Sequence, residues 1–207
     1  MNISHERRRV VVWMGAALAS MPLRSTPALG ADRRPTPAVD EGPFYPRRFP
    51  ADSDADLTRI AGRDEPAKGT PLTLAGRVVD RSGRPRAGAR VEVWQCDSNG
   101  LYHHVGEPEA RLDPNFQGFG ALETDAEGRY SFRTIKPVPY GLRTPHIHFT
   151  VSERGRRVLT SQLFMEGDAM NARDGLYRAL GGDARLVTMP LESVGNEVRG
   201  AFDIVLG

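Results

Sequence analysis

The run from His146 to Ser152 alternates two kinds of side chain, and it constrains the fold more than any other stretch of the sequence. His146, His148 and Thr150 fall on one face of a β-strand, and the apolar residues between them fall on the other face. Two histidines two residues apart on one strand face can both point at a common atom. The run therefore predicts a strand that carries a candidate metal site, whose remaining ligands come from elsewhere in the chain.

Short runs of β-branched and aromatic residues, separated by Gly, Pro, Asn and Asp, recur along most of the chain. The tetrapeptide Asp125–Gly128 lies between two such runs and is a hairpin signal. We expect strands at residues 72–79, 89–95, 120–124, 129–135, 146–152, 157–164, 186–190 and 200–205, and one short helix at 172–180. Short strands joined by turns indicate an all-β fold, either a sandwich or a barrel.

Residues 1–30 have the pattern of an export signal. Arg7–Arg9 form a charged start, and Val10–Ala19 form an apolar run that is too short for a stable membrane span. Small residues at Ala28–Gly30 precede an expected cleavage before Ala31. Paired arginines before the apolar run resemble a twin-arginine signal, and an ordinary secretory signal is the alternative. Both predict a periplasmic or extracellular protein.

The rest of the chain divides into an arm and a domain. Residues 31–70 are rich in Pro, Asp and Arg with little periodicity, which predicts an extended N-terminal arm, whereas the strand pattern occupies residues 71–207. Glu41–Pro46 combines prolines with aromatic residues, as is typical of an extended segment packed on a larger body. Tyr45 in this segment either lines a pocket or only tethers the arm.

Cysteine usage and charge exclude several classes of protein. Cys96 is the only cysteine, so no intramolecular disulfide can form, and the residue is expected as a small buried side chain rather than as a metal ligand or nucleophile. The formal net charge is +2 with interspersed signs, and no basic run beyond the N-terminus indicates nucleic acid.

The candidate metal donors combine imidazoles with phenols. They are Tyr102, Tyr140, His146 and His148, with His103 and His104 in reserve. A phenol has a pKa near ~10 and ligates as phenolate only beside a strong Lewis acid. Zn²⁺ usually takes His, Cys and carboxylates, whereas a hard phenolate suits Fe³⁺. Two histidines alone are weak evidence, because such a pair more often forms a polar strand face.

Seven segments of the chain resemble the intradiol ring-cleavage dioxygenases, the family of catechol and protocatechuate 3,4-dioxygenases. They are Glu41–Pro46, Val91–Asp97, Gly100–Tyr102, Thr124–Pro137, Pro139–Tyr140, Arg143–Phe149 and Gln162–Asp168. They come in the family's order and cover most of residues 40–170. The resemblance implies a β-sandwich of mostly antiparallel strands, in agreement with the strand pattern.

The resemblance also implies roles for individual residues. Tyr102 and His146 match the equatorial ligands of one Fe³⁺ per chain, and Tyr140 and His148 match the axial ligands. The remaining matches are Arg143 and Gln162 beside the substrate ring, with Tyr45 and Leu101 as pocket residues. His103 and His104 have no ligand role in the family pattern.

The implied reaction is cleavage of a catechol-type ring by O₂ between its two hydroxyl-bearing carbons, which gives a muconate-type dicarboxylate. Tyr140 would leave the iron and take up a substrate proton, and Arg143 would stabilise negative charge on the ring. The turn from Tyr140 to His146 is shorter than in the well-known enzymes, and Gly141 and Leu142 stand where those enzymes carry a tryptophan. A more open pocket mouth is expected.

Two other readings remain open at this point. One is an exported β-sandwich binding module of the transthyretin-like kind, in which the histidine pair is incidental. The other is a copper or zinc hydrolase or oxidase. The sequence is compatible with a homo-oligomer and does not fix the oligomeric state.

Overall fold

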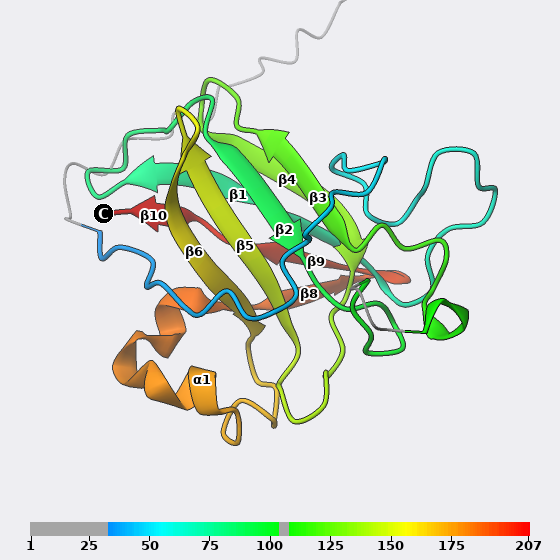
Figure 1. The fold of residues 1–207 in the computed structure, drawn as a ribbon. Helices are drawn as coiled ribbons and strands as arrows, with labels where there is room; N and C mark the ends of the chain where they lie inside the picture. Colours follow the sequence, from blue (N-terminus) through cyan, green and yellow to red (C-terminus); the bar gives the residue numbers. More distant parts are fainter. Residues whose placement is uncertain (1–32, 104–107) are drawn as a thin grey trace, which may run out of the picture.

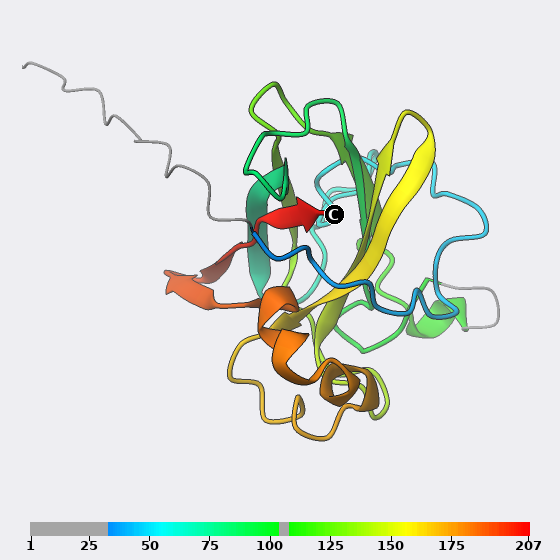
Figure 2. The ribbon, with the colours of Figure 1, turned by 90° about the vertical axis from the view of Figure 1, so that its left-hand side faces the viewer.

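The computed structural model describes residues 33–103 and 108–207 as a sandwich of two five-stranded β-sheets (Figures 1 and 2). The expected export signal and His104 lie outside these residues. Five of the eight strand pairs in the described residues are antiparallel. The expected all-β sandwich is confirmed. No helix in the described part of the chain is long and apolar enough to span a membrane.

The first sheet is built around β1 (Pro71–Asp80). One edge of β1 pairs antiparallel with β4 (Arg129–Ile135). The other edge pairs in parallel first with β9 (Glu197–Ala201) and then with β10 (Ile204–Leu206). β8 (Leu191–Val194) joins β9 as a hairpin and forms the outer edge of this sheet.

The second sheet has the order β3-β2-β5-β6-β7. Its strands are β2 (Arg90–Trp94), β3 (Phe119–Glu123), β5 (His146–Glu153), β6 (Arg156–Met165) and β7 (Thr188–Met189). The histidine strand β5 is therefore central, with a long antiparallel neighbour on each side.

The register of the second sheet brings three functional side chains into one row. Trp94 on β2 is paired with His148 on β5, and His148 is paired with Gln162 on β6. Directly opposite residues point to the same face of a sheet, so these three side chains stand next to one another.

The apolar face of β5 forms the core between the two sheets. Ile147, Phe149 and Val151 are almost completely buried, together with Leu74 and Phe132 of the opposite sheet. Burying a side chain of this size contributes about 1.5–3 kcal/mol. Cys96 is buried and unpaired by any disulfide, so the core supplies the stability that the single cysteine cannot.

The opposite face of β5 and β6 is covered by the first part of the arm, which crosses both strands in Figure 1. Backbone hydrogen bonds attach it to both sheets: Thr36 N–H donates to Val205, and Val39 N–H donates to Thr160. Ser161 donates its hydroxyl to the Pro37 carbonyl. This cover explains why the polar face of β5 is buried as completely as the apolar face.

Three short helical turns complete the described residues. They are the 3₁₀ turn η1 (Glu109–Arg111), the helix α1 (Gly175–Ala179) and the 3₁₀ segment η2 (Gly181–Val187). The helix expected at 172–180 is thus confined to five residues. The strand expected at 186–190 was wrong in its first half, because η2 continues to Val187 and only two residues pair with β6.

The C-terminal strand expected at 200–205 is two strands, β9 and β10, interrupted at Phe202 and Asp203. At the break, Asp203 accepts the Arg77 N–H through its side chain, at 3.0 Å, in place of a strand carbonyl. A Cβ on Gly76 would lie 1.8 Å from the Phe202 carbonyl oxygen, so only glycine allows this close approach. A tertiary contact of this kind has no signature in the local sequence.

Candidate metal centre

Three side-chain atoms from two separate parts of the chain converge at the start of β5. The Tyr102 hydroxyl lies 3.1 Å from Nε2 of His146 and 3.0 Å from Nε2 of His148, and the two nitrogens are 3.1 Å apart. A triangle of this size leaves room for an ion about 2 Å from each corner, the usual distance for nitrogen and oxygen ligands. The structure therefore brings together three of the four expected ligands.

The backbone around Tyr102 is fixed by a buried turn. Asp97 is fully buried and accepts N–H groups from Asn99 and Leu101. Its second carboxylate oxygen accepts the N–H of Asp113 at 2.7 Å. Gly100 has a positive φ, and a Cβ there would lie 2.8 Å from the Pro139 carbonyl oxygen. This turn positions Tyr102 against the face of β5.

Proton accounting favours a cation at the centre of the triangle. Nδ1 of His146 lies 2.6 Å from the Thr144 carbonyl, which can only accept, so Nδ1 carries the proton and Nε2 is a free acceptor. If His148 also carries its proton on Nδ1, it directs a second lone pair inward. Tyr102 then has one proton for two acceptors, and a cation would satisfy the set. Nδ1 of His148 is buried and has no hydrogen-bond partner among the described residues.

Burial keeps all three groups uncharged, which suits the two imidazoles as ligands and opposes ionisation of the phenol. It lowers the pKa of His146 to about 4 and holds the pKa of His148 well below its ordinary value, so both imidazoles are neutral ligands. It raises the pKa of Tyr102 well above that of a free phenol. The phenolate form therefore needs a strong cation beside it.

Aromatic rings hold the three donors in place. The Trp94 ring stacks on His148 with centroids 4.9 Å apart, and Phe44 from the arm stacks on Tyr102 at 4.2 Å. Gly42, also in the arm, comes close enough that a Cβ there would lie 3.6 Å from Cε1 of His148. Neither Trp94 nor Phe44 was singled out from the sequence, although both lie in segments that resemble the family.

Tyr140 lies next to this centre but outside the triangle. Its ring meets Tyr102 edge to face at 5.2 Å and Phe44 at 5.0 Å. Among the described residues, no hydrogen bond joins its hydroxyl to either imidazole. Tyr140 is half-buried, and it begins a tight turn that Arg143 closes with a 2.8 Å backbone hydrogen bond.

Arg143 is held on two sides by buried groups. Its Nε donates to Asp174 at 2.7 Å, and one terminal nitrogen donates to Oε1 of Gln162 at 2.6 Å. Gln162 is completely buried and donates its own amide to the Asp40 carbonyl at 2.6 Å. These hydrogen bonds therefore fix the position of the guanidinium beside the imidazoles.

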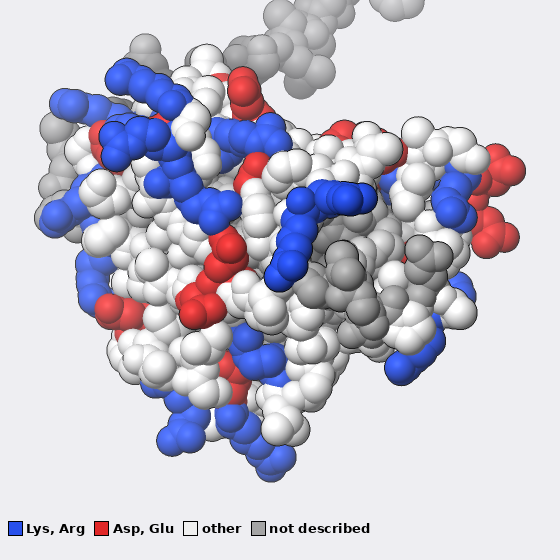
Figure 3. Space-filling view, viewed as in Figure 1, with Lys and Arg blue, Asp and Glu red and all other residues white. Residues whose placement is uncertain are grey.

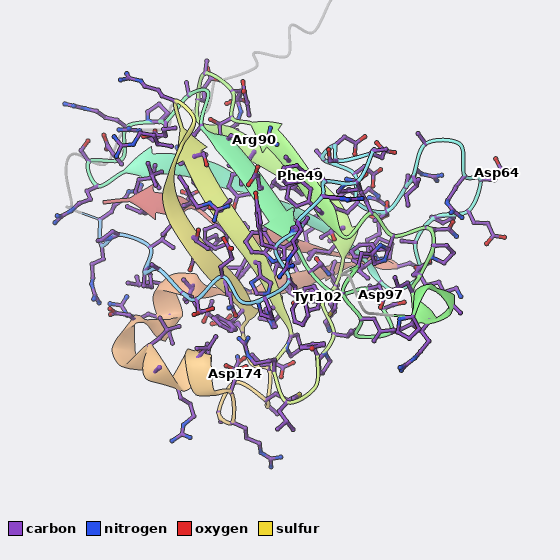
Figure 4. All side chains as sticks on the ribbon, in the orientation of Figure 1. Phe49, Asp64, Arg90, Asp97, Tyr102 and Asp174 are labelled. Carbon is purple, nitrogen blue, oxygen red and sulfur yellow. The ribbon has the colours of Figure 1, made fainter. Side chains whose placement is uncertain are left out.

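Asp174 is a functional candidate that the sequence analysis missed. Its side chain is completely buried and accepts hydrogen bonds from Arg143, from the Thr144 N–H and from the Tyr177 N–H in the first turn of α1. Figure 4 shows Asp174 and Tyr102 at the same end of the second sheet. An aspartate before a short helix is a recognisable N-cap, but its contact with Arg143 arises only in the folded chain.

The other predicted residues lie at the margin of the centre. Tyr45 donates its hydroxyl to Glu92 at 2.9 Å, and its ring packs edge to face on Trp94. Leu101 is buried in the turn that precedes Tyr102. His103 is exposed, and its ring faces Phe116. A cavity of about 110 Å³ lies beside Tyr102 and Trp94 and is lined in part by Phe44, Phe119 and Gln117.

The donor set differs from a common zinc site. In the described part of the chain, no group of three or more His, Cys, Asp or Glu side chains is placed to hold a metal. The converging set consists instead of two imidazoles and one phenol. Cys96 takes no part, because burial raises the pKa of its thiol to about 12 and its sulfur faces the Val138 carbonyl.

Comparison with known proteins identifies the family. A protein-family model described as "Dioxygenase" matches residues 40–207. The beta chain of protocatechuate 3,4-dioxygenase from Burkholderia cepacia is 38% identical over 168 residues, which cover 74% of this chain and 71% of the relative. The chain belongs to the intradiol ring-cleavage dioxygenases.

Other dioxygenases agree with this assignment. Catechol 1,2-dioxygenase 2 from Acinetobacter lwoffii is 36% identical over 170 residues, and the match spans 70% of this chain but only 59% of that longer relative. The dioxygenase domain of a dioxygenase–carbohydrate-binding fusion from Streptomyces sp. SirexAA-E has a TM-score of 0.68 at 33% identity. That match covers 84% of this chain and 98% of the domain. The protein is thus an enzyme of this class, which answers the binding-module alternative.

Proposed function

We propose that this intradiol dioxygenase is a non-haem Fe(III) enzyme that opens a catechol-type ring between its two hydroxyl-bearing carbons. The products of the reaction with O₂ would be muconate-type dicarboxylates. The observation that carries the proposal is the triangle of Tyr102, His146 and His148, with donor atoms 3.0–3.1 Å apart. A neutral imidazole pair and a phenol that ionises only beside a strong cation fit Fe³⁺ better than a soft metal.

Tyr102, His146 and His148 would hold the iron, and Tyr140 would complete the set from its position against the Tyr102 ring. When bound, Fe³⁺ would supply the Lewis acidity that activates a catecholate ring toward O₂. Two phenolates and two imidazoles leave one positive charge to be balanced by hydroxide, which makes burial of the ion tolerable.

The chain's own residues supply proton transfer and charge stabilisation. Tyr140 is half-buried beside Tyr102, and as a phenolate ligand of the iron it would be placed to accept one proton of the catechol. Arg143, fixed by Asp174 and Gln162, presents a positive charge beside the substrate ring. A preorganised guanidinium stabilises negative charge that builds on the ring as O₂ adds.

The names of the relatives support a catechol-type substrate class. The matched proteins act, by their names, on protocatechuate, catechol and hydroxyquinol. The turn from Tyr140 to Arg143 is short, and Leu142 at its tip is 91% exposed. We propose that this turn leaves the mouth open, so that substituted catechols enter as well as catechol itself.

The test is a visible absorption spectrum of the iron-loaded protein, before and after catechol is added without oxygen. A broad phenolate-to-iron band that moves to longer wavelength with catechol would support the ligand set and substrate chelation together. Metal analysis should give one iron per chain. A protein that stays colourless after reconstitution with Fe³⁺, or that binds copper or zinc in preference, would contradict the proposal.

We also propose that the protein is exported, since residues 1–30 carry a signal-like pattern. Fractionation of cells that express the full chain, with N-terminal sequencing of the mature protein, tests this. Replacing both Arg8 and Arg9 with lysine should block export by the twin-arginine route and leave export by the general secretory route intact. Mature protein that still begins before Ala31 and remains in the cytoplasm would contradict export.

A further inference from the structure

A second hollow lies at the opposite end of the β5–β6 pair from the metal centre. It has a volume of about 740 Å³ and is formed by the β1–β2 connection and by the turn between β5 and β6. Five arginines line it, against two carboxylates: Arg84, Arg86, Arg154, Arg156 and Arg157, with Asp80 and Glu153. Figure 3 shows blue side chains gathered over this end of the sheet, at the upper left.

Both carboxylates in the hollow are already engaged. Glu153 binds Arg86 through two hydrogen bonds, at 2.7 and 2.6 Å. Asp80 accepts the backbone N–H groups of Ser82 and Arg84 and the Ser82 hydroxyl, so it serves its own turn. Glu153 is therefore occupied by Arg86, and Asp80 acts within its own turn, where its charge faces Arg84 and Arg86.

Three arginines of the hollow have no ion-pair partner in the described residues. Arg157 pairs with Glu41 and lies over the Tyr45 ring. In contrast, Arg84, Arg154 and Arg156 are exposed and form no ion pair with any residue in the described part of the chain. Their guanidinium forks match the planar geometry of carboxylate, sulfate and phosphate groups.

The backbone at Arg154 has an unusual conformation. Arg154 is the one non-glycine residue with a positive φ, 50°, in the described residues. It precedes Gly155 in a two-residue hairpin turn, where Asn, Asp or Gly is the favoured first residue. The turn accepts a small conformational cost that places an arginine at the rim of the hollow.

We propose that this arginine hollow binds a polyanion, a ligand that carries at least two oxyanion groups such as carboxylates or sulfates. One oxyanion engages one or two guanidinium groups, whereas the hollow offers three unpaired guanidinium groups and far more volume than one such group fills. A ligand with several oxyanions therefore fits it better than a single small anion. The proposal is independent of the ring-cleaving activity.

Two rigid probes test the proposal on the iron-loaded protein: benzene-1,3,5-tricarboxylate and benzene-1,3,5-trisulfonate. Their charged groups are too far apart to chelate one metal ion, so they do not strip iron from the enzyme. Benzoate and benzenesulfonate are the single-charge controls. Calorimetric titration should show one site per chain. Each threefold-charged probe should bind at least about tenfold more tightly than its single-charge control, and its affinity should fall as salt is added.

The variants remove the charge while leaving the fold intact. In the hollow variant, Arg84→Ser, Arg154→Gly and Arg156→Ser are combined. In the control variant, three exposed arginines elsewhere are replaced: Arg59→Ser, Arg63→Ser and Arg111→Ser. Both lower the net charge by the same amount, so nonspecific attraction changes equally.

The expected result is a loss of about tenfold or more in affinity for the hollow variant and none for the control variant. The probe with the higher affinity, tricarboxylate or trisulfonate, identifies the oxyanion that the site prefers. Absence of binding, equal affinity for single-charge and threefold-charged probes, or equal losses in the two variants would overturn the proposal. So would a shift of the visible band or competition by catechol, because either would place the probe at the metal.

Discussion

The two ends of β5 are built from the same strand pair and differ in almost every physical property. At its start, His146 and His148 are buried, uncharged and enclosed by aromatic rings. At its end, the turn through Arg154 is exposed, strongly cationic and open. Arg154 directly follows the eight-residue strand that His146 begins, so the two ends are roughly 20 Å or more apart. Figures 1 and 3 show the two ends at the bottom and at the upper left of the same view.

The arm accounts for the contrast. It crosses β5 and β6 at the metal end, where Gly42 and Phe44 cover His148 and Tyr102, and it removes water from groups that then lose their charge. The turn at the other end has no such cover, and its arginines remain hydrated and charged. Burial thus prepares one end to hold a cation, while exposure prepares the other to attract anions.

The largest expected effect is loss of the metal on replacement of one imidazole. His148→Ala should lower iron affinity at least about 100-fold, more than the loss of an outer hydrogen-bond partner costs, and should abolish the visible band and turnover. It should leave binding of the tricarboxylate probe at the arginine hollow unchanged. Metal analysis, absorption and calorimetry on one preparation measure all three.

The arginine-hollow variant is the reciprocal control for that experiment. It should keep full iron content, the visible band and normal turnover, because none of its positions contacts the metal centre. If it lost iron, or if His148→Ala abolished probe binding in a folded protein, the two ends would be coupled rather than independent.

The next effect separates turnover from metal binding within one end. Arg143→Ala should retain iron and colour and should lower kcat about 10²–10³-fold, since one preorganised charge-stabilising donor is lost. Arg143→Lys should recover little of this, because an ammonium cannot bind Asp174 and Gln162 with the same fork. Near-normal turnover of Arg143→Ala, followed as oxygen uptake, would remove this residue from the chemistry.

A smaller effect is expected at the residue that holds Arg143. Asp174→Asn retains a good helix N-cap. The amide has only one acceptor oxygen, whereas the two carboxylate oxygens of Asp174 accept from Arg143, Thr144 and Tyr177. We expect kcat to fall about tenfold with iron content preserved. Asp183→Asn is the matched control, because it removes only an exposed pair with Arg34. A stability loss without a change in kcat would make Asp174 purely structural.

The sequence predicted the histidine strand far better than the elements that surround it. Alternation in β5 is a local property, so the polar and apolar faces of His146–Ser152 could be assigned from the sequence. The strand expected at 129–135 likewise agrees with β4. Strand β8 was missed although Gly195–Asn196 is a recognisable two-residue hairpin turn. The Asp174–Arg143 contact joins residues 31 positions apart and could not be read from spacing.

Convergence of Tyr102 on the histidines also exceeded what residue patterns alone allowed. A phenol 44 residues before His146 carries only a weak signal as a candidate donor, and the resemblance to a family gave it a specific ligand role. The structure then placed its hydroxyl within 3.1 Å of both imidazoles. Tyr140, chosen on the same grounds, lies beside Tyr102 without joining the triangle, so its role as fourth ligand stays a prediction.

The smallest expected effect concerns the backbone at the arginine end. Arg154→Gly should stabilise the fold by about 0.5–1 kcal/mol, because a left-handed conformation costs about 1–2 kcal/mol for a residue with a Cβ, and the greater freedom of glycine in the unfolded chain cancels part of the gain. Urea denaturation of the single variant measures it, with Arg156→Ser as the control, since Arg156 has no positive φ. An Arg154→Gly variant that is less stable than wild type would mean that the arginine side chain makes a contact worth more than the strain, and the hollow would then be a structural element of the fold rather than a free binding surface.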